Sequence, residues 1–262
     1  MGPCRLLLMT GLILAVPPGW SAPYDFHPQR EAGIIAGGAA LYAIGLGGYT
    51  GREGPSTAEL AALDKQDIPA FERGLAGRWD PGSRNLTDAM LYTSLAMPLL
   101  PALKTPGQAK TIGLLYLETL WWTEAGVTLA KGRVKRYRPF AYGQAAPLDY
   151  RTAPDATRSF FSGHAAGIAA GLVFSAKVYS DLHPDSPHRA AVWTAALTAT
   201  AVGAWQRVES GWHFPSDVLM GALWGGAVGY TVPELHRNHR PDGLQWLPAV
   251  DPPGLRLRIP LP

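Results

Sequence analysis

The chain has 262 residues, of which 47% are hydrophobic and only 16% are charged. That length suits one large domain or a tight pair of domains. The single cysteine, Cys4, excludes a disulfide and a thiolate metal site from the rest of the chain. The net charge is +3, and one short run carries much of the excess: Lys131, Arg133, Lys135, Arg136 and Arg138. Such a run can bind nucleic acid, a membrane surface or a phosphorylated substrate.

The first residues have the composition of a secretory signal. Arg5 supplies a positive charge, and the apolar stretch 6–16 has the length of a signal's hydrophobic region. Small residues at the −3 and −1 positions predict cleavage after Ser21. Residues 1–21 would then be a signal peptide, and 22–262 a single exported domain. An uncleaved N-terminal anchor is the alternative.

The remaining chain predicts an all-α fold, a helical bundle. Residues 32–50 are uncharged and rich in glycine, and they form the best candidate for a membrane span. The capping box Ser56–Glu59 predicts a helix start. Asp67 is expected to cap a short helix that runs through Trp79. An apolar helix over 86–103 should bend or end at its two prolines.

The second half of the chain predicts the longest helices. Thr105 and Pro106 are a typical helix start, and Gly132 is the expected stop after Lys131. A long loop follows. Further helices are expected over 162–180, 189–208 and 215–232, and the tail 233–262, rich in Pro and Leu, is expected to pack across the domain. We lean to an exported or membrane-associated bundle over a protein with several spans, because Glu118 and Glu124 interrupt the apolar run 111–130.

Basic residues and a helix start form a predicted phosphate site. A phosphoryl group in transfer carries negative charge on its oxygens, so the protein mainly supplies position and positive charge. Arg138 and Arg207 suit this role through their planar forks, and Lys131 adds a point charge. Ser162 and Gly163 stand where a helix begins, and the free N–H groups there can bind an anion.

Two histidines supply the predicted chemistry. His213 and Asp217 are four residues apart, so Asp217 can accept the Nδ1–H of His213 and leave the other ring nitrogen to attack phosphorus. His164 follows the phosphate-binding turn and can protonate the departing alkoxide. The sequence has no metal-ligand motif, so we expect neither a metal nor a cofactor. Four other histidines belong to no such cluster and are expected on the surface: His183, His188, His236 and His239.

Together these residues resemble the signature of the type 2 phosphatidic acid phosphatase and vanadium haloperoxidase superfamily. The matching residues span 131–217 and are Lys131, Arg138 and Pro139; Ser162, Gly163 and His164; and Arg207, His213 and Asp217. Phe161 and Gln206 replace the usual Pro and Ser of the signature. The resemblance implies a helical bundle with the active site at the helix ends, and turnover through a phosphohistidine on His213.

The expected function is therefore a metal-independent phosphatase acting on phosphate monoesters or diphosphates, with lipid phosphates of the cell envelope as the leading substrates. The expected partners are a phosphorylated substrate and a membrane, with no nucleic acid. A non-specific periplasmic acid phosphatase, a vanadate-dependent haloperoxidase and a non-catalytic anion-binding protein are the alternatives.

Overall fold

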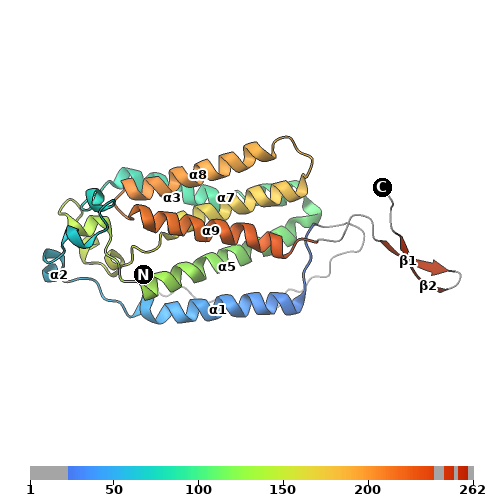
Figure 1. The fold of residues 1–262 in the computed structure, drawn as a ribbon, viewed down its shortest axis with the longest axis horizontal. Helices are drawn as coiled ribbons and strands as arrows, with labels where there is room; N and C mark the ends of the chain where they lie inside the picture. Colours follow the sequence, from blue (N-terminus) through green and yellow to red (C-terminus); the bar gives the residue numbers. More distant parts are fainter. Residues whose placement is uncertain (1–22, 239–244, 251–252, 259–262) are drawn as a thin grey trace.

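The computed structural model describes residues 23–238, 245–250 and 253–258, and the expected signal peptide lies outside them. Long helices lie side by side in a bundle (Figure 1). The α-helices are α1 (Pro28–Thr50), α2 (Thr57–Ala61), α3 (Pro81–Ala96), α4 (Leu99–Lys104), α5 (Ala109–Arg133), α6 (Leu148–Thr152), α7 (Gly163–Leu182), α8 (Arg189–Glu209) and α9 (Pro215–Leu235). Two strands, β1 (Gln245–Val250) and β2 (Pro253–Arg258), follow. The expected all-α bundle is thus confirmed for the helical body of the protein.

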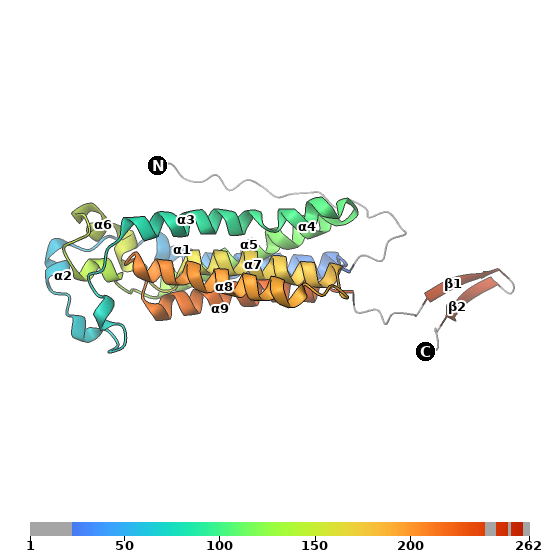
Figure 2. The ribbon, with the colours of Figure 1, turned by 90° about the horizontal axis from the view of Figure 1, so that it is seen from above.

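Helix α7 is the centre of the bundle, and it packs against α3, α5, α8 and α9. Its sequence is dominated by alanine and glycine, with Ile168 and Phe174 fully buried among them. Small residues let neighbouring backbones approach closely. The tightest approach is to α9, and the N-terminal ends of these two helices lie at the same end of the bundle (Figures 1 and 2).

Helix α1 lies on the outside of the bundle, against α5. In the part of the chain that the structure describes, α1 is the only helix long and apolar enough to cross a membrane by length and composition. The most apolar 18-residue stretch of α1 has a mean hydropathy of 1.4, and 11% of that stretch is buried in the protein. The structure therefore agrees with the sequence on which segment is the candidate span.

Several helix ends differ from the sequence prediction. Helix α3 begins before residue 86, because the side chain of Asp80 accepts the Gly82 N–H at 2.9 Å and caps it. Helix α5 begins at Ala109, after a 3₁₀ turn, and it continues through Gly132 to Arg133. Gly132 faces α1, where the backbone of Gly45 leaves no room for a Cβ. This glycine therefore permits a helix crossing and does not stop the helix.

The short helix expected from Asp67 to Trp79 does not form. Asp64, not Asp67, caps a 3₁₀ turn by accepting the Gln66 N–H at 2.8 Å, and a second 3₁₀ turn covers Arg73–Leu75. Gly77 then takes a φ of +92°, a conformation that ends any helix and that glycine adopts without strain. The predicted capping box at Ser56 is confirmed, with Glu59 as its partner.

In the described part of the C-terminal segment, strands β1 and β2 do not pack across the domain as expected. Strands β1 and β2 pair with each other in antiparallel register, from Gln245 opposite Arg258 to Val250 opposite Pro253. Both views show this hairpin beyond one end of the bundle (Figures 1 and 2). The predicted active-site residues belong to the opposite end, where α5 and α8 finish and α7 and α9 begin.

Candidate active site

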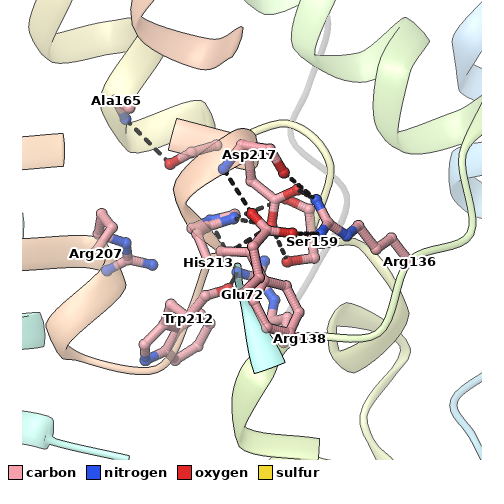
Figure 3. A network of polar contacts seen from close by, with 12 residues as sticks. Glu72, Arg136, Arg138, Ser159, Ala165, Arg207, Trp212, His213 and Asp217 are labelled. Carbon is pink, nitrogen blue, oxygen red and sulfur yellow. Dashed lines mark hydrogen bonds and ion pairs between the residues drawn. The ribbon is translucent and has the colours of Figure 1, made fainter. Parts of the chain in front are cut away.

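His213 is the buried centre of the site, with 1% of its surface exposed. It lies in the short loop between α8 and α9, where Gly211 takes a φ of +75°. The Nδ1 atom is 2.7 Å from the backbone oxygen of Ser159. Because a carbonyl oxygen can only accept, Nδ1 carries the hydrogen and Nε2 carries the lone pair. Nε2 in turn faces the Nη1 atom of Arg138 at 3.0 Å (Figure 3).

The predicted hydrogen bond between His213 and Asp217 is not present. The Oδ2 atom of Asp217 is 3.9 Å from Nδ1 of His213, which is beyond hydrogen-bond distance. Oδ2 instead accepts the Ser159 hydroxyl at 2.6 Å and the Phe214 N–H at 2.9 Å. Asp217 thus positions His213 through Ser159, whose carbonyl oxygen accepts the Nδ1–H.

A buried acid–base network, which the sequence did not reveal, fixes this end of α9. Glu72 is fully buried, and it accepts the Ser216 N–H at 2.8 Å and Arg136 Nη2 at 2.5 Å. The other end of the same guanidinium binds Asp217 (Figure 3). Arg136 therefore neutralises two buried carboxylates, and this part of the basic run is structural.

The three predicted phosphate-binding cations surround His213. Arg138 is 2% exposed, and it donates to the carboxylate of Asp155 at 2.9 Å and to the Trp212 carbonyl at 2.8 Å. Arg207 is also 2% exposed, and its Nε and Nη1 atoms have no hydrogen-bond acceptor among the described residues. Lys131 lies in the last turn of α5, and its Nζ atom is 4.0 Å from the position that a Cβ on Gly163 would take.

These positive charges shift the protonation of the whole site. Burial first, and then Arg138 and Arg207, hold the pKa of His213 well below its usual value. Desolvation, reinforced by Arg138, lowers the pKa of Lys131 to about 8. Burial, with Arg138 close by, lowers the pKa of Arg207 to about 9. A site in which cations destabilise one another in this way favours a bound anion.

His164 has a carboxylate partner that the sequence did not identify. Its Nε2 atom is 2.8 Å from the Oδ1 atom of Asp88, on α3. The same oxygen lies 3.6 Å from Nη1 of Arg207. Burial and the charge of Arg207 lower the pKa of His164 to about 4, against the opposing effect of Asp88. Asp88 therefore links the predicted acid to a predicted phosphate ligand.

Two hydrogen bonds fix Ser162, the residue just before α7. Ser162 caps the helix by accepting the Ala165 N–H at 3.2 Å, and its own N–H donates to the Asp217 carbonyl at 3.0 Å. The first-turn N–H groups from Gly163 onward are those with no partner inside the helix. A phosphate role for Ser162 and Gly163 stays a prediction, carried by this helix start.

The two departures from the signature lie outside the nucleophile and its partners. Phe161 packs with Val127 and Ala166 in a small apolar cluster, 8% exposed. Gln206 lies half-buried in the last turns of α8, one residue before Arg207. Neither position removes a residue from the contacts of His213.

An apolar cavity of about 760 Å³ runs between α3, α4, α7 and α8. Leu86 and Ala89 of α3 line one part of it, and it extends along Ile168 and Leu172 toward the far end of α7. Most of its lining is apolar, with Thr93, Ser94 and Ser175 among the exceptions, so the cavity suits a hydrocarbon chain more than a polar group.

A buried neutral imidazole lies among three cations at the ends of bundled helices, an arrangement that suits the transfer of a phosphoryl group. The sequence profile of the PAP2 superfamily matches residues 112–241, which contain every predicted site residue, and the chain belongs to this superfamily. Among solved structures, the first transmembrane PAP2 type phosphatidylglycerolphosphate phosphatase from Bacillus subtilis aligns with 20% identity and a TM-score of 0.48. That alignment covers 80% of this chain and 98% of the other. No curated protein matches the sequence.

Proposed function

We propose that this protein is a metal-independent phosphatase that hydrolyses phosphate monoesters or diphosphates through a phosphohistidine on His213. One observation carries the proposal: a buried imidazole, held neutral with its lone pair on Nε2, lies among three cations. A neutral imidazole is the nucleophilic form. The cations Lys131, Arg138 and Arg207 would bind the oxygens of the phosphoryl group and stabilise their charge during transfer.

In the first step, Nε2 of His213 attacks phosphorus and a P–N bond forms as the ester P–O bond breaks. The departing alkoxide takes a proton from His164. In the second step, water gives a proton back to His164 and its oxygen attacks phosphorus. The P–N bond breaks, and free phosphate leaves. Arg138, which contacts Nε2, would move its donor to a phosphate oxygen when substrate binds.

His164 must be protonated to act as the acid, although burial and the charge of Arg207 lower its pKa to about 4. A bound phosphate supplies negative charge next to the ring, which raises the pKa of a histidine. It also offsets the charge of Arg207, a major cause of the low value. Substrate binding would therefore help to charge the acid that the reaction needs.

Lipid phosphates are the proposed substrates. The apolar cavity is lined by Leu86 and Ala89, on the same helix as Asp88, the partner of His164, and it could hold an acyl or prenyl chain while the phosphate lies against His213. Large apolar side chains on the outer faces of α8 and α9 support a membrane location: Leu197, Trp205, Leu219 and Leu223 are each more than half exposed. We propose an exported enzyme of the cell envelope.

A substrate panel tests this proposal. Release of phosphate is measured, in the presence of EDTA, from a phosphatidic acid, a prenyl diphosphate and a soluble alkyl phosphate. We expect turnover of the lipid substrates at a much higher kcat/KM than the soluble ester. Equal values on all three would support a non-specific acid phosphatase. Dependence on a divalent ion for the chemical step, or halide oxidation with vanadate in place of phosphatase activity, would contradict the proposal.

A further inference from the structure

A second cluster of ionisable groups lies at the opposite end of the bundle. It is formed by Glu31 in the first turn of α1, Glu118 on α5 and His236 just after α9. His236 was expected on the surface, yet it is fully buried. From Glu118 to Lys131 is thirteen residues along α5, or about 20 Å at the rise of a helix. This cluster is therefore separate from the active site.

The donor atoms of the cluster converge. Nε2 of His236 is 2.8 Å from Oε2 of Glu31 and 3.4 Å from Oε2 of Glu118. All three donor atoms lie within 4.8 Å of one another. A tetrahedral Zn²⁺ bound at about 2.0–2.2 Å keeps its donors about 3.4 Å apart. The three side chains are thus spaced as ligands of one ion are.

The imidazole presents a lone pair to the carboxylates. Its Nδ1 atom is 2.8 Å from the backbone oxygen of Val232, which can only accept a hydrogen bond. Nδ1 therefore carries the hydrogen, as it does in metal-bound histidines whose second nitrogen donates to a carbonyl. In the neutral ring, Nε2 then points its lone pair at two carboxylate oxygens, so a proton or a metal ion must lie between these atoms.

The second observation is an unsatisfied oxygen. Oε2 of Glu118 is buried and has no hydrogen-bond donor among the described residues, while the side chain as a whole is 11% exposed. Leaving a buried carboxylate oxygen without a partner is costly. A bound cation would satisfy this atom directly.

The surroundings fix the cluster in place. Arg30 binds the other oxygen of Glu31, Oε1, and leaves Oε2 free to face His236. The ring of Phe26 packs on the imidazole with 5.3 Å between centroids. The backbone N–H of Asp25 donates to the His236 carbonyl at 2.8 Å. Both the ligands and their supporting contacts are therefore built into the fold.

We propose that Glu31, Glu118 and His236 bind one divalent transition-metal ion of the Zn²⁺ class, which ties α1 to α5 and α9. Imidazole nitrogen and carboxylate oxygen are suitable donors for such an ion. The ion would be structural, since the site is remote from His213. It holds an outer helix whose main packing partner among the long helices is α5.

The test uses the full chain, stripped with EDTA and titrated with Zn²⁺, with bound metal measured by mass spectrometry and Tm by scanning fluorimetry. We expect one bound ion per chain and a rise in Tm. Glu118→Gln and His236→Ala should each weaken Zn²⁺ binding by at least about 100-fold, more than loss of an outer-shell partner usually does. His188→Ala, an exposed histidine at the same end of the bundle, should bind as the parent protein does.

Glu118→Gln keeps the shape of the side chain, so its Tm in EDTA shows whether it is folded; if it is not, Glu31→Gln replaces it. A folded variant of either kind that binds Zn²⁺ as tightly as the parent protein would overturn the proposal. So would a parent protein that binds no ion, or a loss in His188→Ala as large as that in Glu118→Gln. Phosphatase turnover below the unfolding temperature should survive EDTA, so failure here leaves the His213 mechanism untouched.

Discussion

Two buried histidines lie at opposite ends of the bundle, and the fold holds them in the same way. His213 donates its Nδ1–H to the Ser159 carbonyl at 2.7 Å, and His236 donates its Nδ1–H to the Val232 carbonyl at 2.8 Å. Both rings therefore turn Nε2 toward a cluster of charges, and what differs is the sign of those charges.

Nε2 of His213 meets Arg138 at 3.0 Å, with Arg207 and Lys131 also acting on it. Nε2 of His236 meets only carboxylates, those of Glu31 and Glu118. One end of the bundle is thus arranged for an anion and the other for a cation. Burial and tautomer leave a lone pair on Nε2 of both histidines, and the charge of the neighbouring groups sets whether an anion or a cation is expected there.

The largest expected effect is the difference in phosphatase activity between His213→Ala and His236→Ala. His213→Ala should lower kcat by at least about 10⁴ on every substrate, because it removes the nucleophile. His236→Ala, measured well below its Tm, should keep most of the activity of the parent protein. Phosphate release from one lipid phosphate and one soluble ester checks both variants. Similar losses in the two would mean that the ends of the bundle do not differ as proposed.

His164→Ala should show a loss that depends on the leaving group. A nitrophenolate leaves without much help, whereas an alkoxide needs a proton, and general acid catalysis contributes about 10²–10⁴ in rate. We therefore expect a loss in that range on an alkyl phosphate and a much smaller loss on nitrophenyl phosphate. Equal losses on both substrates would exclude the role of acid. Asp88→Asn is a useful companion, since it keeps the size of the partner of His164 and removes its charge.

Removing a cation at the active-site end should cost less than removing the nucleophile. Arg138→Ala and Arg207→Ala should each lower kcat/KM by about 10²–10³, through lost stabilisation of charge in the transition state. The loss should be the same for good and poor leaving groups, unlike that of His164→Ala. Arg189→Ala, at the start of α8 on the opposite end of the bundle, is the control and should stay active. Steady-state kinetics on the alkyl phosphate and on nitrophenyl phosphate measures kcat/KM for all three arginine variants.

Acid should lower the stability of the folded protein, an effect smaller than those on activity. The pKa of His164 is about 4 in the folded protein and about 6.5 in an unfolded chain. Between these values the unfolded chain binds a proton that the native protein does not, so stability falls as the pH drops from 6.5 toward 4.

His164→Gln removes this titration, so its Tm should fall less over that interval than the Tm of the parent protein. Comparing the two slopes isolates His164, because the other groups titrate in both. His183→Gln, an exposed control, should follow the parent protein. A slope unchanged in His164→Gln would show that His164 is not held neutral.

The sequence predicted most of the active site because its residues occupy fixed spacings at helix ends, where the chain direction places them together. It did not identify Glu72 or Asp88, since their partners depend on how α3 and the loop before it pack against distant helices. It also predicted a hydrogen bond from His213 to Asp217, whereas the Asp217 carboxylate accepts the Ser159 hydroxyl instead. The spacing of four residues sets proximity but not the direction of the hydrogen bond.

The cluster of Glu31, Glu118 and His236 could not be predicted from residue spacing. Glu31 and His236 are separated by 205 positions, and only the packing of α1 and α9 against α5 brings them to 2.8 Å. Helix ends were misread for the same reason. Gly132 has the local pattern of a helix end, yet α5 continues past it, and its missing side chain lets the backbone of α1 approach. Residues with roles set by a distant helix are the ones that local patterns misread.

The central claim is that His213 carries the phosphoryl group during turnover. A substrate labelled with ³²P at phosphorus is mixed with His164→Ala, which should slow the second step, and the reaction is quenched in base, where phosphohistidine survives. Peptide mass spectrometry should find the label on His213, and it should appear at a rate at least equal to turnover. The label on another residue, or phosphate release by the parent protein with no label on His213 at any time, would contradict the account.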